Sequence, residues 1–463
     1  MANRPFIALD LGTSHIKGAV IDLERVALGH ISLAPFPAAL PGLPPFFVEI
    51  DPDQIVAAVR QVIRELLPHA PHCAGIVMCG QMGGLVLTSE RGQPLSNYIS
   101  WRDQRLLLPA PGDEGTYFDR LVERLSPTDQ RQLGREVRPG LPISYLYWLA
   151  VENRLPPAGA IAATLTDFVC ANLCGSPPAM HLTQAVGALN LETLDWHHSA
   201  FAALGLEAVR WPRLLDVREA VGQFEMDGAA LPCYAAVGDH QGALAGVSLG
   251  YEELSVNIST GSQVGLLTAA LELGDYQTRP YFDSRFINTL THIPAGRALN
   301  VLLNLLTELA AAQQVELADP WPFIEQASSA AANTDLSVDL AFFPSPVGER
   351  GAIRNINEAN LTVGQLFYAA FRNMADNYYS CALRLSPTKA WRTLVFSGGL
   401  AQKPAMLRQL VAARLPGEVR VCSTTEETLL GLLAIAMVVS GRSPSVAAAS
   451  EALREREPVS DAN

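Results

Sequence analysis

Residues 10–17 read Asp-Leu-Gly-Thr-Ser-His-Ile-Lys and give the first indication of the architecture. Apolar runs on either side, at Pro5–Asp10 and Lys17–Asp22, predict two strands joined by a glycine-containing turn. Such a turn brings backbone N–H groups close to a phosphate, and Thr13 and Ser14, next to Gly12, add hydroxyl donors. Asp10, at a strand end, can hold magnesium directly or through water. The plainer interpretation is a polar hairpin turn, because short glycine-rich motifs are weak signals.

A second strand–turn–strand unit of the same design follows about 250 residues later. Apolar runs at Leu254–Ile258 and Val264–Leu267 enclose the turn Ser259-Thr260-Gly261-Ser262. Two such turns could hold one polyphosphate from both sides. Because 463 residues exceed a single hydrophobic core, the repeat predicts two domains, 1–250 and 251–445, followed by a polar tail, 446–463, that frays.

The overall composition argues against several classes of protein. The net charge is −13 and no lysine or arginine cluster is evident, so we expect no nucleic-acid partner. The longest apolar run, around Leu429–Val439, is too short to cross a bilayer, and the N-terminus lacks the apolar segment of a signal peptide. The 7 cysteines form no CxxC pair. A reducing, cytoplasmic location with no membrane partner is therefore expected.

The segment Gly238-Asp239-His240-Gln241-Gly242 lies between an expected strand, Tyr234–Val237, and an expected helix, Asp239–Leu249. Aspartate is a common helix N-cap, which is the plainer interpretation of Asp239. As a general base, its carboxylate would take the proton of an attacking hydroxyl. His240 is a second candidate base, although a single histidine beside a turn is more often a packing residue.

Two further segments combine polar groups with an aromatic ring, as sugar sites do. Gly80-Gln81-Met82-Gly83 supplies an amide, and Trp101-Arg102-Asp103-Gln104-Arg105 supplies an indole, a guanidinium and a carboxylate. A surface turn with a buried tryptophan is an equally good explanation. The glycines of Ser397-Gly398-Gly399-Leu400 would let a flat purine lie against the backbone, although an ordinary strand-to-helix turn accounts for them as well.

The remaining pattern is read as mainly helical. Helices are expected at Asp53–Leu67, Ser144–Asn153 and Ala179–Asn190, and the polar, proline-rich segment Leu108–Pro142 is expected to be an insertion or an irregular helical region. After the second hairpin, helices are expected to dominate, with one strand at Thr393–Phe396.

Taken together and in this order, the five segments resemble the FGGY family of carbohydrate kinases, over nearly the whole chain. The resemblance implies an α/β protein of the two-lobed actin/hexokinase/heat-shock-ATPase fold, each lobe a ribonuclease-H-like mixed sheet flanked by helices. It makes segment 1–250 the sugar-binding and catalytic lobe and segment 251–445 the nucleotide-binding lobe. ATP and Mg²⁺ are the implied cofactors and a small sugar the implied partner. The oligomeric state stays open, with a homodimer as one candidate.

The resemblance also implies roles for individual residues. Asp239 matches the catalytic aspartate, and Asp10 would help to place magnesium. The ATP phosphates would lie on Gly12, Thr13, Ser14, Thr260 and Gly261, and the adenosine near Gly398 and Gly399. The sugar would contact Gln81, Met82, Arg102, Asp103 and Asp239.

Three stretches are most similar to the sedoheptulokinase branch, which phosphorylates the terminal hydroxyl of a seven-carbon ketose. They are Arg279–Asp283, Asn300–Leu302 and Phe343–Arg350. Two features depart from the family pattern. Gly83 stands where many ketose kinases have a histidine that contacts a sugar hydroxyl, and Leu400–Pro404 gives no basis for carrying over base and ribose contacts.

Three other functions stay open at this stage. Specificity like that of xylulokinases or ribulokinases is the alternative within the kinases. An actin- or chaperone-like ATPase would share the fold but would hydrolyse ATP without a sugar. A sugar-binding regulator without catalysis would have lost the chemistry, which the presence of both Asp10 and Asp239 argues against.

Overall fold

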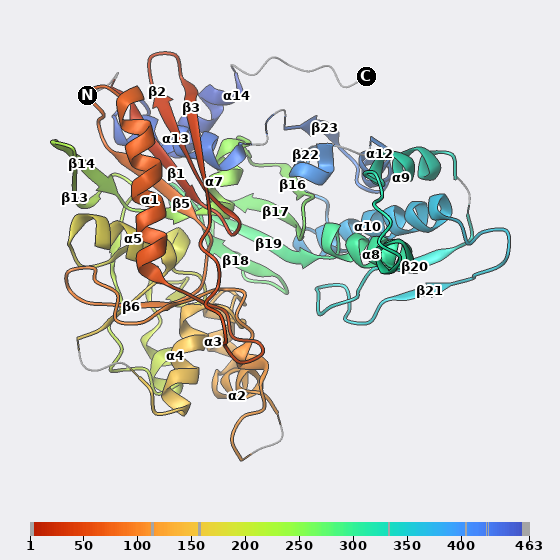
Figure 1. Ribbon diagram of the computed structural model, residues 1–463, viewed down its shortest axis with the longest axis horizontal. Helices are drawn as coiled ribbons and strands as arrows, with labels where there is room; N and C mark the ends of the chain where they lie inside the picture. The colour runs from red at the N-terminus through yellow and green to blue at the C-terminus, as the bar shows by residue number, and fades with distance from the viewer. Residues whose placement is uncertain are drawn as a thin grey trace.

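The computed structural model describes residues 4–112, 115–155, 159–331, 334–402, 405–422, 424 and 426–455. Two mixed β-sheets, one in each lobe, form its framework, and helices cover their faces (Figure 1). The expected α/β class with two lobes is confirmed at the level of architecture.

The first sheet is built around the hairpin expected at residues 5–22. Strand β1 (Phe6–Leu11) is antiparallel to β2 (His15–Asp22) and parallel to β5 (Ile76–Gly80). The strand order is β13-β14-β5-β1-β2-β3, and β15 (Val237–Gly238) also pairs with β5. Strands β1 and β5 are buried almost throughout because both faces of the sheet are covered. The other strands are β3 (Ala27–Pro35), β13 (Ala220–Met226) and β14 (Ala229–Tyr234).

Helix α1 (Pro52–Leu66) covers one face of this sheet together with α5 (Leu165–Cys174). The Asp51 side chain caps α1 by accepting a hydrogen bond from the Asp53 amide, and Pro52 starts the first turn. The residues of α1 that face the sheet are apolar, and the helix expected at Asp53–Leu67 is confirmed.

A smaller region lies below the first sheet in Figure 1 and contains short helices. It includes segment 108–142, which was expected to be an insertion or an irregular helical region and does contain short helices. The short helices of this lobe are α2 (Tyr117–Arg124), α3 (Pro127–Gln132), α4 (Pro142–Val151), α6 (His198–Ala203) and α7 (Asp239–Gly246). Short strand pairs brace it: β4 (Glu49–Ile50) with β7 (Tyr98–Ile99), β6 (Val86–Thr88) with β8 (Ile161–Ala163), β9 (Ala179–His181) with β12 (Arg213–Leu215), and β10 (Leu189–Asn190) with β11 (Asp195–Trp196).

The second sheet repeats the design of the first. Strands β16 (Glu253–Asn257) and β17 (Ser262–Thr268) form an antiparallel hairpin, and β22 (Thr393–Ser397) runs parallel to β16, as β5 does to β1. The order is β18-β19-β17-β16-β22-β23. The remaining strands are β18 (Gln277–Pro280), β19 (Phe286–Ile293) and β23 (Glu418–Val421), with the separate pair β20 (Ser337–Asp339) and β21 (Ala352–Arg354).

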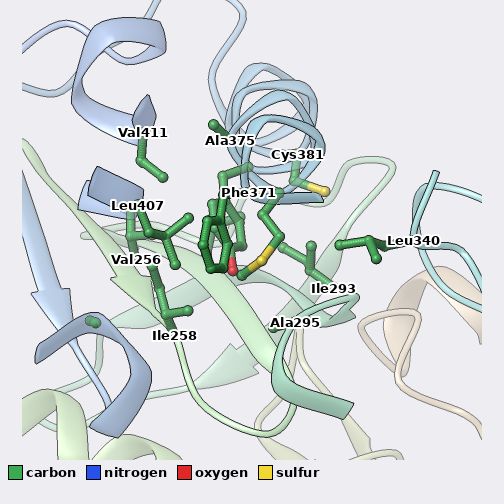
Figure 2. Close-up of a cluster of buried hydrophobic side chains, with 14 of the residues drawn as sticks. Val256, Ile258, Ile293, Ala295, Leu340, Phe371, Ala375, Cys381, Leu407 and Val411 are labelled. Carbon is green, nitrogen blue, oxygen red and sulfur yellow. The ribbon is translucent and has the colours of Figure 1, made fainter. Parts of the chain in front are cut away.

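The outer face of the second sheet packs against long helices. Figure 2 shows part of this core, in which Val256 and Ile258 of the sheet face Phe371 and Leu407. The helices of this lobe are α8 (Gly296–Ala312), α9 (Trp321–Ser329), α10 (Val363–Leu385), α11 (Gly399–Gln402) and α12 (Ala405–Arg414).

The core between the two lobes is formed around a single helix, α13 (Glu427–Val439). This helix packs against α7 and against the face of the first sheet that α1 leaves open. Residues of both sheets join this core, including Val77 and Cys79 from the first and Ile287 and Val395 from the second. Although α13 comes late in the chain, much of its contact surface is therefore in the first lobe, beside β1 and β5.

Glycines set the close approach of α7 and α13. A Cβ atom on Gly431 would lie 1.9 Å from the Gly242 carbonyl oxygen, and one on Gly246 would lie 1.8 Å from the carbonyl oxygen of Glu427. Side chains there would force the two backbones apart, so these positions require glycine.

Replacing Gly431 by alanine is expected to destabilise the protein by about 3 kcal/mol, because the added methyl overpacks a helix contact that cannot relax. Urea unfolding followed by circular dichroism measures the effect. Gly29→Ala is the matched control, since its new Cβ would meet only the Val20 carbonyl oxygen, at 3.9 Å. Equal unfolding midpoints for the two variants would contradict the prediction.

Two expectations about local structure are wrong, and two strands were not predicted. Segment 179–190, expected to be a helix, forms β9, a short 3₁₀ turn and β10, because the Thr183 hydroxyl and the Gln184 amide bind the 237–238 backbone instead of facing solvent. Strands β18 and β19 lie in the part of the chain that was expected to be mainly helical, and neither strand was predicted. The expected polar tail, 446–463, begins with helix α14 (Val446–Arg454), which buries Val446, Ala449 and Leu453; residues 456–463 lie outside the described part.

The last strand of the first sheet, β15, and the first strand of the second sheet, β16, lie on either side of the expected boundary near residue 250. The division into domains at 1–250 and 251–445 stays a prediction, since α13 and α14 return to the first lobe. Within the described ranges, none of the helices has the length and apolarity needed to span a bilayer.

Candidate active site

Asp10 lies at the end of β1, in a row of residues that crosses three strands. It is opposite Cys79 of β5, and Cys79 is in turn opposite Val237 of β15. With strands about 4.8 Å apart, the α-carbons of Asp10 and Val237 are about 10 Å from each other. Asp239 follows two residues after Val237, so the sheet brings the two predicted carboxylates to the same edge.

Asp239 is the first residue of α7, and one of its oxygens accepts a hydrogen bond of 2.7 Å from the His240 amide. Burial, together with the nearby charge of Asp10, raises the pKa of Asp239 to about 7. Burial raises the pKa of Asp10 as well, although the Thr428 hydroxyl and the Lys17 ammonium oppose the shift. Two coupled carboxylates of this kind suit a proton acceptor and a metal-holding group.

His240 is a poor candidate for the base. Its Nδ1 accepts a hydrogen bond of 2.9 Å from Arg279 Nη1. Arg279 also pairs, through its Nε, with the buried carboxylate of Glu136. Burial and the charges of Arg279 and Arg138 hold the pKa of His240 well below its usual range. The ring therefore stays neutral, with one nitrogen already occupied.

The first turn and the predicted sugar segments contact one another directly. The indole of Trp101 donates to Thr13 Oγ1 at 3.3 Å, and the Gln81 amide donates to the Gly12 carbonyl oxygen at 3.4 Å. Ser14 is exposed beside them. The Met82 sulfur would lie 2.9 Å from a Cβ on Gly238, one residue before Asp239. The structure thus brings Gly12, Thr13, Gln81, Met82 and Asp239 to one place.

Asp103 and Arg102 are placed differently from their neighbours. Asp103 is fully buried, and both of its oxygens accept hydrogen bonds within the protein, from the Val48 amide and from the backbone and guanidinium of Arg105. Arg102 is exposed. The contact of Asp103 with sugar stays a prediction, and its visible role is to fix the loop that carries Trp101 and Arg102.

Gly83 has a physical reason for departing from the family pattern. Its φ is +92°, and a Cβ there would lie 2.6 Å from the Gly140 carbonyl oxygen. A histidine cannot occupy this position unless the loop around residue 140 moves. The loop therefore closes the place where a histidine ring would lie.

The second turn and the adenosine segment meet at the end of β16. The Ile258 carbonyl oxygen accepts a hydrogen bond of 3.0 Å from the Leu400 amide, and α8 starts on the turn, where the Gly296 amide donates to Ser259. Thr260 and Gly261 are exposed at this edge, and a Cβ on Gly261 or on Gly399 would meet nothing within 4 Å. Residues 403–404 lie outside the described part.

Replacing Gly398 by alanine is expected to raise the KM for ATP about tenfold, with a small effect on the KM for the sugar. Gly398 has φ +87°, and a Cβ would lie 2.6 Å from the Ile258 carbonyl oxygen, so the turn must shift. Steady-state kinetics with each substrate varied in turn measures the effect. The control is Gly250→Ala, whose Cβ would make only ordinary contacts with Glu253; an unchanged KM for ATP in Gly398→Ala would contradict the prediction.

The carboxylates at this edge fit magnesium held largely by phosphates. Among the described residues, no group of three or more histidines, cysteines or acids could form a metal cage. Mg²⁺ usually keeps several waters and binds through one or two carboxylates plus substrate phosphates. Asp10 and Asp239 supply that number of oxygen ligands.

Sequence reasoning missed the residues that α13 brings to the site. Thr428 Oγ1 donates a hydrogen bond of 2.6 Å to Asp10, and Glu426 pairs with Lys17 at 2.6 Å. These contacts join residues more than 400 positions apart, so no local pattern could have indicated them.

The fold defines the class of protein. The structure is similar to that of gluconate kinase from Lactobacillus acidophilus, with a TM-score of 0.83 at 17% identity over 96% of this chain and 92% of that one. It is similar to glycerol kinase from Plasmodium falciparum with ADP, with a TM-score of 0.82 at 16% identity over 97% of this chain and 92% of that one. These likenesses confirm the two-lobed fold.

The sequence then identifies the family. The model of the N-terminal domain of the FGGY family of carbohydrate kinases matches residues 6–246, more than half of the chain. The protein belongs to the FGGY family of carbohydrate kinases.

Individual relatives are more distant. The chain is 25% identical to glycerol kinase from Methylobacterium radiotolerans over 52% of this chain and 49% of that protein. It is 21% identical to gluconokinase from Bacillus licheniformis over 94% of this chain and 88% of that one. The chain spans about half the length of the glycerol kinases that it matches.

Proposed function

We propose that this protein uses ATP and Mg²⁺ to phosphorylate a sugar hydroxyl, with Asp239 as the general base. The observation that carries the proposal is the meeting of Asp10 and Asp239 at one sheet edge, beside the first turn and the sugar segment. A hydrolase for ATP alone would not need Gln81 and Trp101 bound to the first turn.

The chemical step would follow from this arrangement. Asp239, in its ionised form, takes the proton of the sugar hydroxyl as the hydroxyl oxygen forms a bond to the γ-phosphorus. The bond from that phosphorus to the bridging oxygen breaks in line, and ADP leaves. Magnesium, when bound near Asp10, offsets the negative charge of the phosphates.

The remaining residues would position the two substrates. Gly12, Thr13 and Ser14 of the first turn and Thr260 and Gly261 of the second donate to the phosphates. Gly398 and Gly399 accommodate the adenosine. Gln81, Met82 and Arg102 contact the sugar, and Asp103, through Arg105, fixes the loop that carries Arg102.

We propose the terminal hydroxyl of a ketose such as sedoheptulose as the acceptor. The support is the similarity of Arg279–Asp283, Asn300–Leu302 and Phe343–Arg350 to the sedoheptulokinase branch. Arg279 lies within hydrogen-bond distance of His240, next to Asp239, so this stretch is close to the reacting centre. A cytoplasmic location is part of the proposal, and a homodimer is compatible with it.

Specificity for a pentulose is the second candidate. A xylulose kinase from Staphylococcus epidermidis is 32% identical over 125 residues, 26% of this chain and 25% of that protein. The structure is also similar to that of xylulose kinase from Lactobacillus acidophilus, with a TM-score of 0.83 at 18% identity over 97% of this chain and 92% of that one.

The test is a coupled assay of ADP release over ketoses and polyols of three to seven carbons, with gluconate included. The highest kcat/KM with a seven-carbon ketose is the expected result. A preference for a pentulose, glycerol or gluconate would overturn the choice of sugar but leave the kinase proposal standing. ADP release that is independent of every sugar would overturn the kinase proposal itself.

A further inference from the structure

Three consecutive residues at the start of α13 contact three separate parts of the candidate nucleotide site. Glu426 Oε2 lies 2.6 Å from Lys17 Nζ, at the end of the first phosphate hairpin. Glu427 Oε1 accepts a hydrogen bond of 2.9 Å from the amide of Gly398, in the adenosine turn. Thr428 Oγ1 donates a hydrogen bond of 2.6 Å to Asp10 Oδ2.

We propose that this turn of α13, residues 426–428, couples the adenosine turn to the metal-holding carboxylate, and that Thr428 is the positioning residue for Asp10. The inference rests on the proposed function, because it takes Asp10 as the group that places magnesium. Thr428 acts through Asp10 and not on a substrate directly.

The surroundings of Asp10 explain why a neutral donor is needed. Lys17 is its cross-strand neighbour in the hairpin and could pair with it, but the Lys17 ammonium is held by Glu426. On the neighbouring strand Asp10 is opposite Cys79, whose thiol is at most a weak donor. A carboxylate has about four acceptor positions, so the neutral donor Thr428 fixes its orientation and leaves positions for a cation or its water shell.

The position of α13 makes the coupling mechanical. The helix is anchored in the core between the lobes, and its contact with α7 leaves no room for a side chain at Gly431. Gly398, by contrast, sits at the end of β22 in the second sheet. Because Glu427 and Thr428 are adjacent, a movement of the adenosine turn changes the hydrogen bond to Asp10 through one peptide unit.

The contacts imply different effects for the two side chains. Without the Thr428 hydroxyl, Asp10 loses a charge-assisted hydrogen bond and with it a fixed orientation. Without the Glu427 carboxylate, the Gly398 amide loses its acceptor, so the adenosine turn and the metal site should both respond.

The first test is Thr428→Val, which keeps the shape of the side chain and removes the donor. The expected result is about a tenfold rise in the Mg²⁺ concentration for half-maximal activity, the size of one lost hydrogen bond to a charged group. The KM for the sugar should change less than twofold, and Thr428→Ser should resemble the unmodified protein. Thr268→Val is the matched control, because the buried Thr268 hydroxyl has no partner among the described residues.

Binding of Mn²⁺ to the ADP complex, followed by electron paramagnetic resonance, gives a readout that does not depend on turnover. Thr428→Val should weaken it about tenfold, and Thr428→Ser should not. A loss in Thr428→Ser as large as in Thr428→Val would show a packing effect and would overturn the inference.

Glu427 provides a second variant pair if Thr428→Val folds poorly. Glu427→Ala should raise both the KM for ATP and the half-maximal Mg²⁺ concentration, whereas Glu427→Gln, which keeps an acceptor oxygen, should have a smaller effect on both. A rise in the KM for ATP with unchanged Mg²⁺ dependence would overturn the coupling.

Asp10→Asn separates this inference from the proposed function. If Asp10→Asn keeps full activity and Mg²⁺ dependence, the role of Asp10 itself is wrong. If Asp10→Asn is impaired while Thr428→Val matches the unmodified protein, the proposed function stands and the positioning role of Thr428 is overturned.

Discussion

Replacing Asp239 by asparagine is expected to lower kcat about 1,000-fold, within the range for loss of a general base. Asparagine keeps the size of the side chain and an oxygen that can accept the 2.7 Å hydrogen bond from the His240 amide. What it loses is the ability to take the proton of the attacking hydroxyl. Binding of an ATP analogue, measured by calorimetry, should change little.

The control for this variant is Asp275→Asn, which removes a carboxylate that is 79% exposed and whose ion pairs lie on the surface. Its kcat should stay within twofold of the unmodified protein. A kcat for Asp239→Asn within tenfold of the unmodified value would mean that another group takes the proton.

The rate is expected to rise with pH, to be half-maximal near pH 7 and to level off above about pH 8. Only the ionised carboxylate of Asp239 can act as a base, and burial with the charge of Asp10 raises its pKa to about 7. Below that value kcat/KM should fall about tenfold per pH unit, so the loss between pH 7 and pH 5 is about 50- to 100-fold. A coupled assay from pH 5 to 9 at constant ionic strength measures the profile.

Bound magnesium should move this profile. A cation beside Asp10 favours the ionised form of Asp239, so the midpoint for kcat, with substrates bound, should lie at lower pH than the midpoint for kcat/KM. A flat profile, or a rate that falls as the pH rises from 5 to 7, would contradict the assignment of Asp239 as the base.

The same pKa carries a consequence for stability. Because burial raises the pKa of Asp239 from 3.8 to about 7 in the folded protein, the folded state binds this proton more tightly than the unfolded state does. The stability contributed by the bound proton is complete below pH 3.8 and is lost as the pH rises to about 7. Asp239→Asn should therefore be more stable than the unmodified protein at pH 8. Catalytic residues commonly lower the stability of a protein in this way.

The two hairpins and their turns could be predicted because their signals are local. Each consists of two apolar runs around a short polar turn with glycine, and β1–β2 and β16–β17 form where this pattern occurs. Asp239 could also be predicted as a candidate, because it stands between an expected strand and an expected helix. That these segments meet depends on sheet order, which the hairpins alone do not determine.

The misassigned segments show where local patterns fail. In segment 179–190 the polar side chains of Thr183 and Gln184 bind the backbone before Asp239, so their contacts are tertiary and periodicity is a poor guide. Strand β19 is buried on both faces and lacks the alternation that marks a half-exposed strand. Helix α14 was mistaken for a tail because it is short, but its apolar side packs into the core between the lobes.

The side chains of the site also include some whose contacts could not be predicted from the local sequence. Asp103 has a carboxylate that could bind a sugar. The guanidinium of Arg105, two residues later, donates hydrogen bonds to both of its oxygens, and the sequence pattern does not reveal this pairing. Thr428 and Glu427 lie in a segment that reads as the start of an apolar helix, and their partners are Asp10 and Gly398. Residues that position others are harder to find in a sequence than the residues that they position.

The most direct test of the account is a crystal structure with a non-hydrolysable ATP analogue, Mg²⁺ and the sugar that the assay selects. The γ-phosphate is expected to lie between residues 12–14 and 259–262, with the acceptor hydroxyl within hydrogen-bond distance of the Asp239 carboxylate. Phosphates bound away from either turn, or a sugar whose hydroxyl approaches a different residue, would contradict it.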